Sequence, residues 1–259
     1  MRCVGPMLLL LLAAALAFGC GADHARTADN DVSLRALKEH VGTYPGGQVM
    51  ERFSYYADSS GEKVRHGLRK HYFDDGSLHI QSEYVDGEEH GEAFAFYSDG
   101  GLERHESWSH GKATGLWQGW HQTGELAWNA TYRDGNIVGS KDFWMNGVVN
   151  ARETYDNNGG LTKREVWYPY YPNAEATNTK IRHGKRSEGT YRNGLPHGTW
   201  TYWHKDGRVK AVGEWKDGKP WSGVCAVPAA GDAGSWGGLA SFHNFKDGAD
   251  LGPAALPEE

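Results

Sequence analysis

Cysteine is scarce in this chain of 259 residues, which has only Cys3, Cys20 and Cys225. If an export signal is removed and Cys20 carries lipid, as argued below, Cys225 is left with no partner. An intramolecular disulfide scaffold is then excluded, even outside the cytoplasm. A lone cysteine between Val224 and Ala226 is typical of a small buried residue rather than a nucleophile.

An excess of positive charge is also missing. Lysine and arginine number 27 against 33 aspartates and glutamates, which leaves a net charge of −6. Nucleic-acid binding needs a basic surface to neutralise phosphates, so the composition argues against a nucleic-acid partner.

Long apolar runs are absent except near the N-terminus. Met7 to Ala17 is apolar, but it is shorter than the roughly 20 residues that cross a bilayer. After Arg2, this run fits the core of an export signal.

The run ends in Leu16-Ala17-Phe18-Gly19-Cys20, where small residues before a cysteine resemble the bacterial lipobox. The resemblance implies cleavage before Cys20, lipidation at Cys20 and membrane attachment through that lipid in the cell envelope. Gly21 follows where an aspartate would indicate inner-membrane retention, which implies the outer membrane if the cell has one. The alternative is an ordinary secretory signal in which Cys20 is incidental.

What the chain does have is an internal repeat of 24 residues. Its 36 glycines include Gly67, Gly91, Gly115 and Gly139 at this interval, and the pattern resumes at Gly198. An aromatic residue stands five positions after each of these glycines. A tyrosine or tryptophan stands seventeen positions after four of them. Such self-similarity indicates a repeat architecture.

Each repeat reads as a β-hairpin. Asp-Gly or Asn-Gly pairs punctuate the chain, and both pairs tolerate the positive φ angles of tight hairpin turns. They occur at 75–76, 86–87, 99–100, 134–135, 146–147, 158–159, 193–194, 206–207, 217–218 and 247–248. Between them, Leu78, Ile80, Ser82 and Tyr84 alternate with polar residues, as in a strand with one apolar face. The sequence therefore predicts an all-β fold, an elongated single-layer antiparallel sheet of 24-residue hairpins.

The motif Gly-x4-aromatic-x3-Gly-x-Leu, followed by Tyr or Trp and a further Asp-Gly, resembles the MORN repeat. It is closest to the bacterial MORN variant found in lipoproteins and in antitoxin-like proteins of the YwqK type. The resemblance covers roughly residues 43–223 and implies the hairpin fold. It also implies an antitoxin or immunity role as one alternative function.

The expected organisation has four parts, with two insertions in the repeat domain. They are a lipoprotein signal peptide (1–19), a lipidated tether with a short capping helix at Val32 to His40 (20–42), a MORN-like repeat domain (43–248, insertions near 169–186 and 226–241) and a disordered tail (249–259).

No catalytic residue, metal site or cofactor is predicted. His66, His90 and His197 share one repeat position, but successive repeats would place such histidines about 10 Å apart, too far to share a zinc ion. The many aspartates are explained by turn geometry. An enzyme would need a pocket that combines Cys225 with a histidine such as His243, and this is the least favoured alternative.

Binding residues are sought among aromatic and basic side chains. Aromatics five and seventeen positions after each glycine are expected to form the core. Aromatics beside them should point the other way, because adjacent strand residues face opposite sides. A second candidate is the basic stretch in the first insertion, for which a solvated loop is the alternative. The candidate residues are Phe73, Trp117, Phe143, Trp200, Tyr202, Lys180, Arg182, Lys185 and Arg186.

Exposed aromatics on a rigid sheet suit recognition. The sequence thus favours a lipid-anchored envelope protein that binds or scaffolds an unknown protein partner. A cell-wall glycan is the second candidate ligand, and the chain is not expected to be an enzyme.

Overall fold

The computed structural model describes residues 36–170, 184–227 and 241–256. The chain divides into Met1–Ala36 and Leu37–Glu259, and the fold below is that of the second unit. Within the described ranges all regular structure is β, and no helix there is long and apolar enough to cross a membrane.

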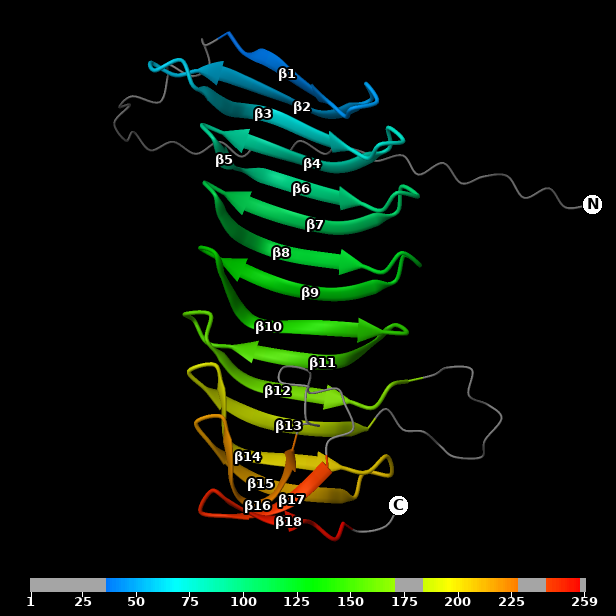
Figure 1. Ribbon diagram of the computed structural model, residues 1–259, viewed down its shortest axis with the longest axis vertical. Helices are drawn as coiled ribbons and strands as arrows, with labels where there is room; N and C mark the ends of the chain where they lie inside the picture. Colours follow the sequence, from blue (N-terminus) through cyan, green and yellow to red (C-terminus); the bar gives the residue numbers. More distant parts are fainter. Residues whose placement is uncertain (1–35, 171–183, 228–240, 257–259) are drawn as a thin grey trace, which may run out of the picture. The chain divides into compact units, whose positions relative to one another are not determined.

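The strands follow one another along the chain. They are β1 (Lys38–Thr43), β2 (Val49–Ala57), β3 (Lys63–Tyr72), β4 (Leu78–Val85), β5 (Glu88–Glu89), β6 (Gly91–Phe96), β7 (Leu102–Ser109), β8 (Lys112–Trp120), β9 (Leu126–Arg133), β10 (Asn136–Met145), β11 (Val148–Tyr155), β12 (Leu161–Trp167), β13 (Lys185–Arg192), β14 (Leu195–Trp203), β15 (Val209–Lys216), β16 (Lys219–Val227), β17 (Ser241–Lys246) and β18 (Ala249–Pro253). Each pairs antiparallel with its neighbour in sequence, and β4 pairs with both β5 and β6. The result is one open sheet, which confirms the predicted fold class (Figure 1).

The turns have two geometries, and both geometries occur at each edge of the sheet. At Asp86-Gly87 both residues have positive φ (50° and 88°), as a two-residue type I′ hairpin requires. At the other edge the loop closes when Phe73 N–H donates to Ser77 O (2.8 Å), and only the glycine, Gly76, has positive φ. Both geometries repeat along the chain, so the Asp-Gly and Asn-Gly pairs mark turns as predicted.

The first glycine of each repeat lies opposite an aromatic on the next strand. Gly67 pairs with Tyr84 and Gly115 with Tyr132. The same arrangement recurs in Gly91–Trp108, Gly139–Tyr155 and Gly198–Trp215. Each glycine has positive φ, between 66° and 91°. These positions therefore favour glycine because it accepts a backbone conformation that other residues rarely adopt.

The sheet curls at its C-terminal end, where the only buried aromatic cluster of the described residues forms. Trp200, Trp215 and Cys225 are 4%, 3% and 0% exposed. The rings of Tyr202 in β14 and Phe242 in β17 lie 5.1 Å apart. In a flat sheet, strands three steps apart would be separated by about 14 Å. The end of the sheet has therefore folded over its own aromatic face, which departs from a strictly single layer because the rings there are buried between strands.

Two expectations about the ends are wrong. Lys38–His40 belong to β1 rather than to a capping helix, because they pair with Phe53–Tyr55; residues 32–35 lie outside the described residues. Ala249–Pro253 form β18 rather than a disordered tail, because the Asp247-Gly248 turn returns the chain along β17. The signal sequence, Cys20 and the central parts of both insertions also lie outside the described residues.

Candidate functional site

One face of the sheet carries most of the large rings. Residues directly opposite each other on antiparallel strands lie on the same face. Trp117 pairs with Ala130 and Ala130 with Lys141. Trp128 pairs with Phe143 across the same two strands. We call this side face A. The pairing continues through β11 to β13 to include Trp200 and Tyr202.

Face A holds a partly exposed aromatic cluster over β7–β10. The ring centroids of Trp108 and Trp117 are 4.9 Å apart, and those of Trp117 and Tyr132 are 4.5 Å apart. Lys141 Nζ lies 5.0 Å from the ring centroid of Trp128 and 5.1 Å from that of Phe143. We call these six residues the ring patch: Trp108, Trp117, Trp128, Tyr132, Lys141 and Phe143.

Small residues beneath the rings set their orientation. Ala130 is 2% exposed and Ala113 is 7% exposed. A Cβ atom at Gly119 would lie 2.2 Å from Trp128 Nε1, so the indole lies directly over the glycine. Trp117 Nε1 donates to the backbone oxygen of Ser107 (3.0 Å). The rings are therefore held in place by the sheet before any ligand arrives.

The charged groups at the ring patch differ in whether an opposite charge lies beside them. Burial raises the pKa of Glu106, although Arg104 Nη1 lies 3.1 Å away and opposes the shift. Burial and the nearby charge of Glu106 raise the pKa of Tyr132. Within the described residues, Lys141 has no carboxylate oxygen within ion-pair distance. Glu153 lies opposite it but accepts a bond from the Tyr155 hydroxyl (2.7 Å).

The same repeat positions are covered at the C-terminal end and open in the middle. Trp117 and Trp200 both stand two residues after a repeat glycine, and Tyr132 and Trp215 both stand seventeen after one. Trp200 and Trp215 are buried in a cluster against which Phe242 and Phe245 pack. Trp117 and Tyr132 are partly exposed. Face A is thus a core where the chain folds back on it and a free surface where it does not.

The structure separates the predicted aromatic candidates. Trp117 and Phe143 lie in the ring patch and remain candidates. The expectation of outward-facing rings is wrong for Trp200 and Tyr202, which are 4% and 9% exposed because the C-terminal strands cover them. Phe73 opens a turn and stacks on His79, with ring centroids 4.2 Å apart, away from the patch.

Sequence reasoning missed four members of the ring patch. Trp108 and Tyr132 were assigned to the core together with aromatics such as Trp120. The structure places these two sets on opposite faces, since Trp120 follows Gly119 of face A directly. Alternation places Trp128 on the same face of its strand as Tyr132, but neither Trp128 nor Lys141 is among the predicted binding residues. The sequence alone does not place them beside Trp117, because that depends on which residues pair between the strands.

The basic stretch does not form a free cationic site in the described part. Lys185 Nζ lies 2.7 Å from a carboxylate oxygen of Glu165 and 2.5 Å from one of Glu188. Arg186 lies in β13 and is partly buried. Lys180 and Arg182 lie outside the described residues.

Cys225 does not fit a nucleophile. It is fully buried, and burial raises the pKa of its thiol to about 11. His66 and His197 accept backbone N–H bonds at turns, from Asp86 (3.3 Å) and Asp217 (3.4 Å). Across the described ranges, no group of three or more His, Cys, Asp or Glu side chains is placed to hold a metal ion.

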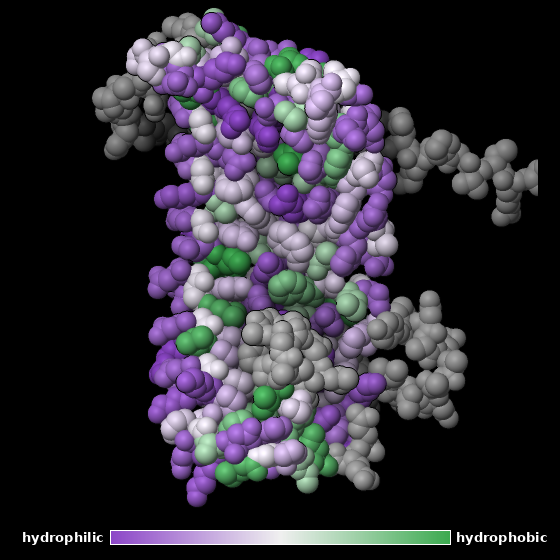
Figure 2. Space-filling model, viewed as in Figure 1, coloured by the Kyte–Doolittle hydropathy of each residue, from purple (hydrophilic) through white to green (hydrophobic). Residues whose placement is uncertain are grey.

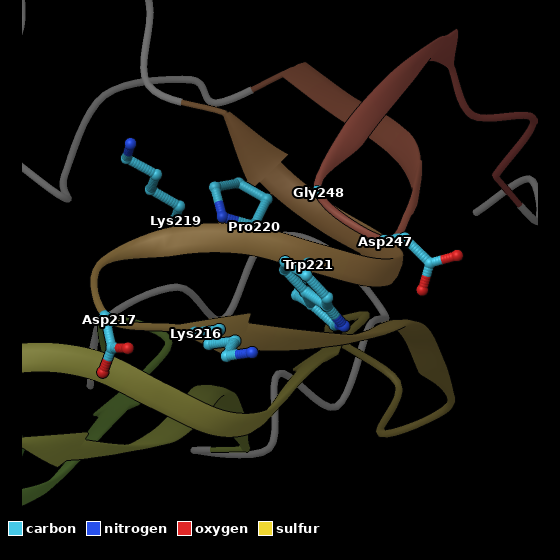
Figure 3. Close-up of a pocket in the computed structure, with 7 residues that line it drawn as sticks. All are labelled: Lys216, Asp217, Lys219, Pro220, Trp221, Asp247 and Gly248. Atoms are coloured by element: carbon cyan, nitrogen blue, oxygen red, sulfur yellow. The ribbon is translucent and has the colours of Figure 1, made fainter.

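A shallow hollow of about 450 Å³ lies near the turns of β15–β16 and β17–β18. In it, Lys216 Nζ lies 4.4 Å from the ring centroid of the exposed Trp221 (Figure 3). Two lysines and two aspartates line it. This balance of charge selects no ligand class, so the hollow is secondary to the ring patch.

Comparison with known families agrees with the repeat geometry. Residues 65–86 match the family described as MORN repeat variant. This segment is similar to a MORN repeat. It covers most of β3, all of β4 and the start of the Asp86-Gly87 turn, which together make one hairpin of the sheet. No curated protein matches the chain. MORN repeats generally serve in binding and scaffolding and are typically non-catalytic.

Proposed function

We propose that this MORN-repeat chain is a binding and scaffold module of the cell envelope, attached to a membrane by lipid at Cys20. A protein partner docks on face A at the ring patch. The observation that carries this proposal is the contrast between the two ends of face A. Equivalent rings are buried by the chain itself at β14–β17 and are left partly exposed at β7–β10.

The ring patch has the character of an interaction hot spot. Tryptophan and tyrosine dominate binding energy in protein interfaces, and rings that are already fixed lose little entropy on binding. On the face of the molecule that Figure 2 shows, apolar residues are interspersed with polar ones. Such mixed surfaces are usual where partners bind without permanent burial.

Photo-crosslinking tests this location. A photo-reactive phenylalanine analogue replaces Trp117 in the native membrane protein, and a matched variant carries it at Leu116. Leu116 is the adjacent residue on the opposite face and is 47% exposed. We expect one discrete crosslinked protein from position 117 only. Equal products from both positions, or a product from 116 alone, would contradict the proposal.

Lipid attachment is tested separately. Cells are labelled with a clickable palmitate analogue, and the chain is isolated with either Cys20 or Cys20→Ser. Label that depends on Cys20, together with membrane fractionation, supports the anchor. Recovery of both forms in the soluble fraction would refute the lipid anchor at Cys20.

A cell-wall glycan is the second candidate ligand, because fixed and partly exposed indoles can stack on sugar rings. Co-sedimentation of the protein with purified cell wall, lost in Trp117→Ala, would favour it over a protein partner. An immunity or antitoxin role remains a narrower form of the protein-binding proposal. A periplasmic target is required, since the proposed signal exports the chain.

A further inference from the structure

We propose that the partner at the ring patch is a protein with an acidic segment, whose carboxylate pairs with Lys141 while neighbouring apolar groups pack on Trp117 and Tyr132. This inference rests on the function proposed above and adds the chemistry of the partner.

The charge of face A differs from that of the whole chain, which carries −6. Following the strand register from β1 to β13, face A has more cations than carboxylates. The cations are Lys38, Lys63, Arg65, Arg69, Arg104, Lys141 and Arg164. The carboxylates are Glu51, Glu89, Glu106 and Glu153. A positive face on an acidic protein favours an acidic partner, and it disfavours face-to-face pairing with a second copy.

Lys141 is the uncompensated cation at the centre of this face. By contrast, Lys163 of β12 and Lys185 of β13, on the opposite face, both contact Glu165 and Glu188. Lys141 instead lies between two rings, and in the described part of the chain no carboxylate meets it. Arg65 repeats this arrangement near the other end of the sheet, between Phe53 (4.9 Å) and Tyr84 (5.6 Å).

This arrangement constrains whatever covers the patch. A lysine that loses its water under an apolar surface must regain an opposite charge or hydrogen bonds, since an unpaired buried charge is strongly unfavourable. The rings already hold Lys141 in position, so an arriving carboxylate need not order a flexible side chain. A neutral or basic surface that covered the rings would leave the Lys141 charge buried without a partner.

Two labelled peptides test this chemistry. The probe is a fluorescein-labelled peptide of alternating phenylalanine and glutamate, and its twin has glutamine at every glutamate. Binding to the whole protein is followed by fluorescence anisotropy. We expect the glutamate peptide to bind at least about tenfold more tightly, with this preference falling as salt is raised.

Lys141→Met should abolish the preference and retain the stem that packs on the rings. Lys112→Met is the matched control, because Lys112 is exposed at the start of β8 and its substitution removes the same charge. Circular dichroism of both variants verifies that the sheet is intact. Equal binding of the two peptides, or a preference that survives Lys141→Met, overturns the inference.

The outcome separates this inference from the proposed function. If a protein crosslinks at position 117 and its binding is unchanged by Lys141→Met, the acidic segment is refuted and the docking surface stands. If only cell wall binds, and Lys141→Met releases it, the carboxylate belongs to a glycan and the protein partner is refuted.

Discussion

Replacing equivalent tryptophans at the two ends of face A should have unequal effects on stability. Trp117 and Trp200 occupy the same repeat position and the same face, but only Trp200 is covered, at 4% exposure. If face A is a core at β14–β17 and a free surface at β7–β10, then Trp200→Ala must destabilise the fold far more than Trp117→Ala.

The magnitudes follow from burial. Truncating a fully buried tryptophan to alanine costs about 3–5 kcal/mol, which includes the cavity left behind. Trp200 also contacts Tyr191, Tyr202 and Trp215, whose ring contacts would be lost. For a domain of this size, the melting temperature should fall by roughly 6–20 °C. Trp117 has no layer above it, so we expect about 1–2 kcal/mol and a few degrees.

Hydrogen exchange gives the most direct measurement, because repeat arrays open in segments rather than all at once. Trp200→Ala should accelerate exchange of the amides of β14–β16 and leave those of β3 and β4 unchanged. Thermal unfolding by circular dichroism supplies the global comparison. Equal losses for the two variants, or a larger loss for Trp117→Ala, would refute the division of face A into core and surface.

Three further predictions follow from buried or paired groups. Cys225 should resist Ellman's reagent in the folded protein near pH 8 and react on denaturation, because burial raises its pKa to about 11; rapid reaction without denaturant would contradict its burial. Gly189→Ala should destabilise β13–β14 by about 3 kcal/mol or more, since a Cβ there would lie 2.0 Å from the Trp200 ring; an unchanged urea midpoint would show that this contact is not tight. Burial raises the pKa of Glu165, but bonds from Lys185 and Lys163 outweigh it and lower the pKa below 4.5. The stability from this pair is therefore present above pH 4.5 and lost as the pH falls through the lowered value; Lys185→Met should remove that contribution, at most about 1 kcal/mol, and flatten the urea midpoint against pH in this range.

Turn geometry explains the placement of two of the periodic histidines. His66 and His197 sit before the repeat glycines and accept backbone N–H bonds from the turn that follows. Two of the three histidines at this repeat position thus cap a turn, whereas Nδ1 of the third, His90, accepts no such bond. Periodic polar residues in a repeat protein can be structural for this reason even when their spacing suggests a ladder of ligands.

The 24-residue interval, the Asp-Gly and Asn-Gly pairs and the alternation of apolar residues were sufficient to predict an antiparallel sheet of hairpins. These signals are local, because a turn type depends on two or three residues and alternation depends on one strand. They even located Trp117 and Phe143. They could not separate them from Trp200 and Tyr202, which have the same local pattern.

Only the tertiary structure decided which rings are covered. Burial of Trp200 depends on the curl that brings Phe242, some forty residues later, over the face. The face of each ring also depends on register: Gly115 pairs with Tyr132 and Trp120 is an odd number of residues from Gly115, so the rings at the fifth and seventeenth positions lie on opposite sides. The register depends on how each strand pairs with the next, and the curl depends on contacts between strands that are not adjacent, so alternation within one strand contains neither.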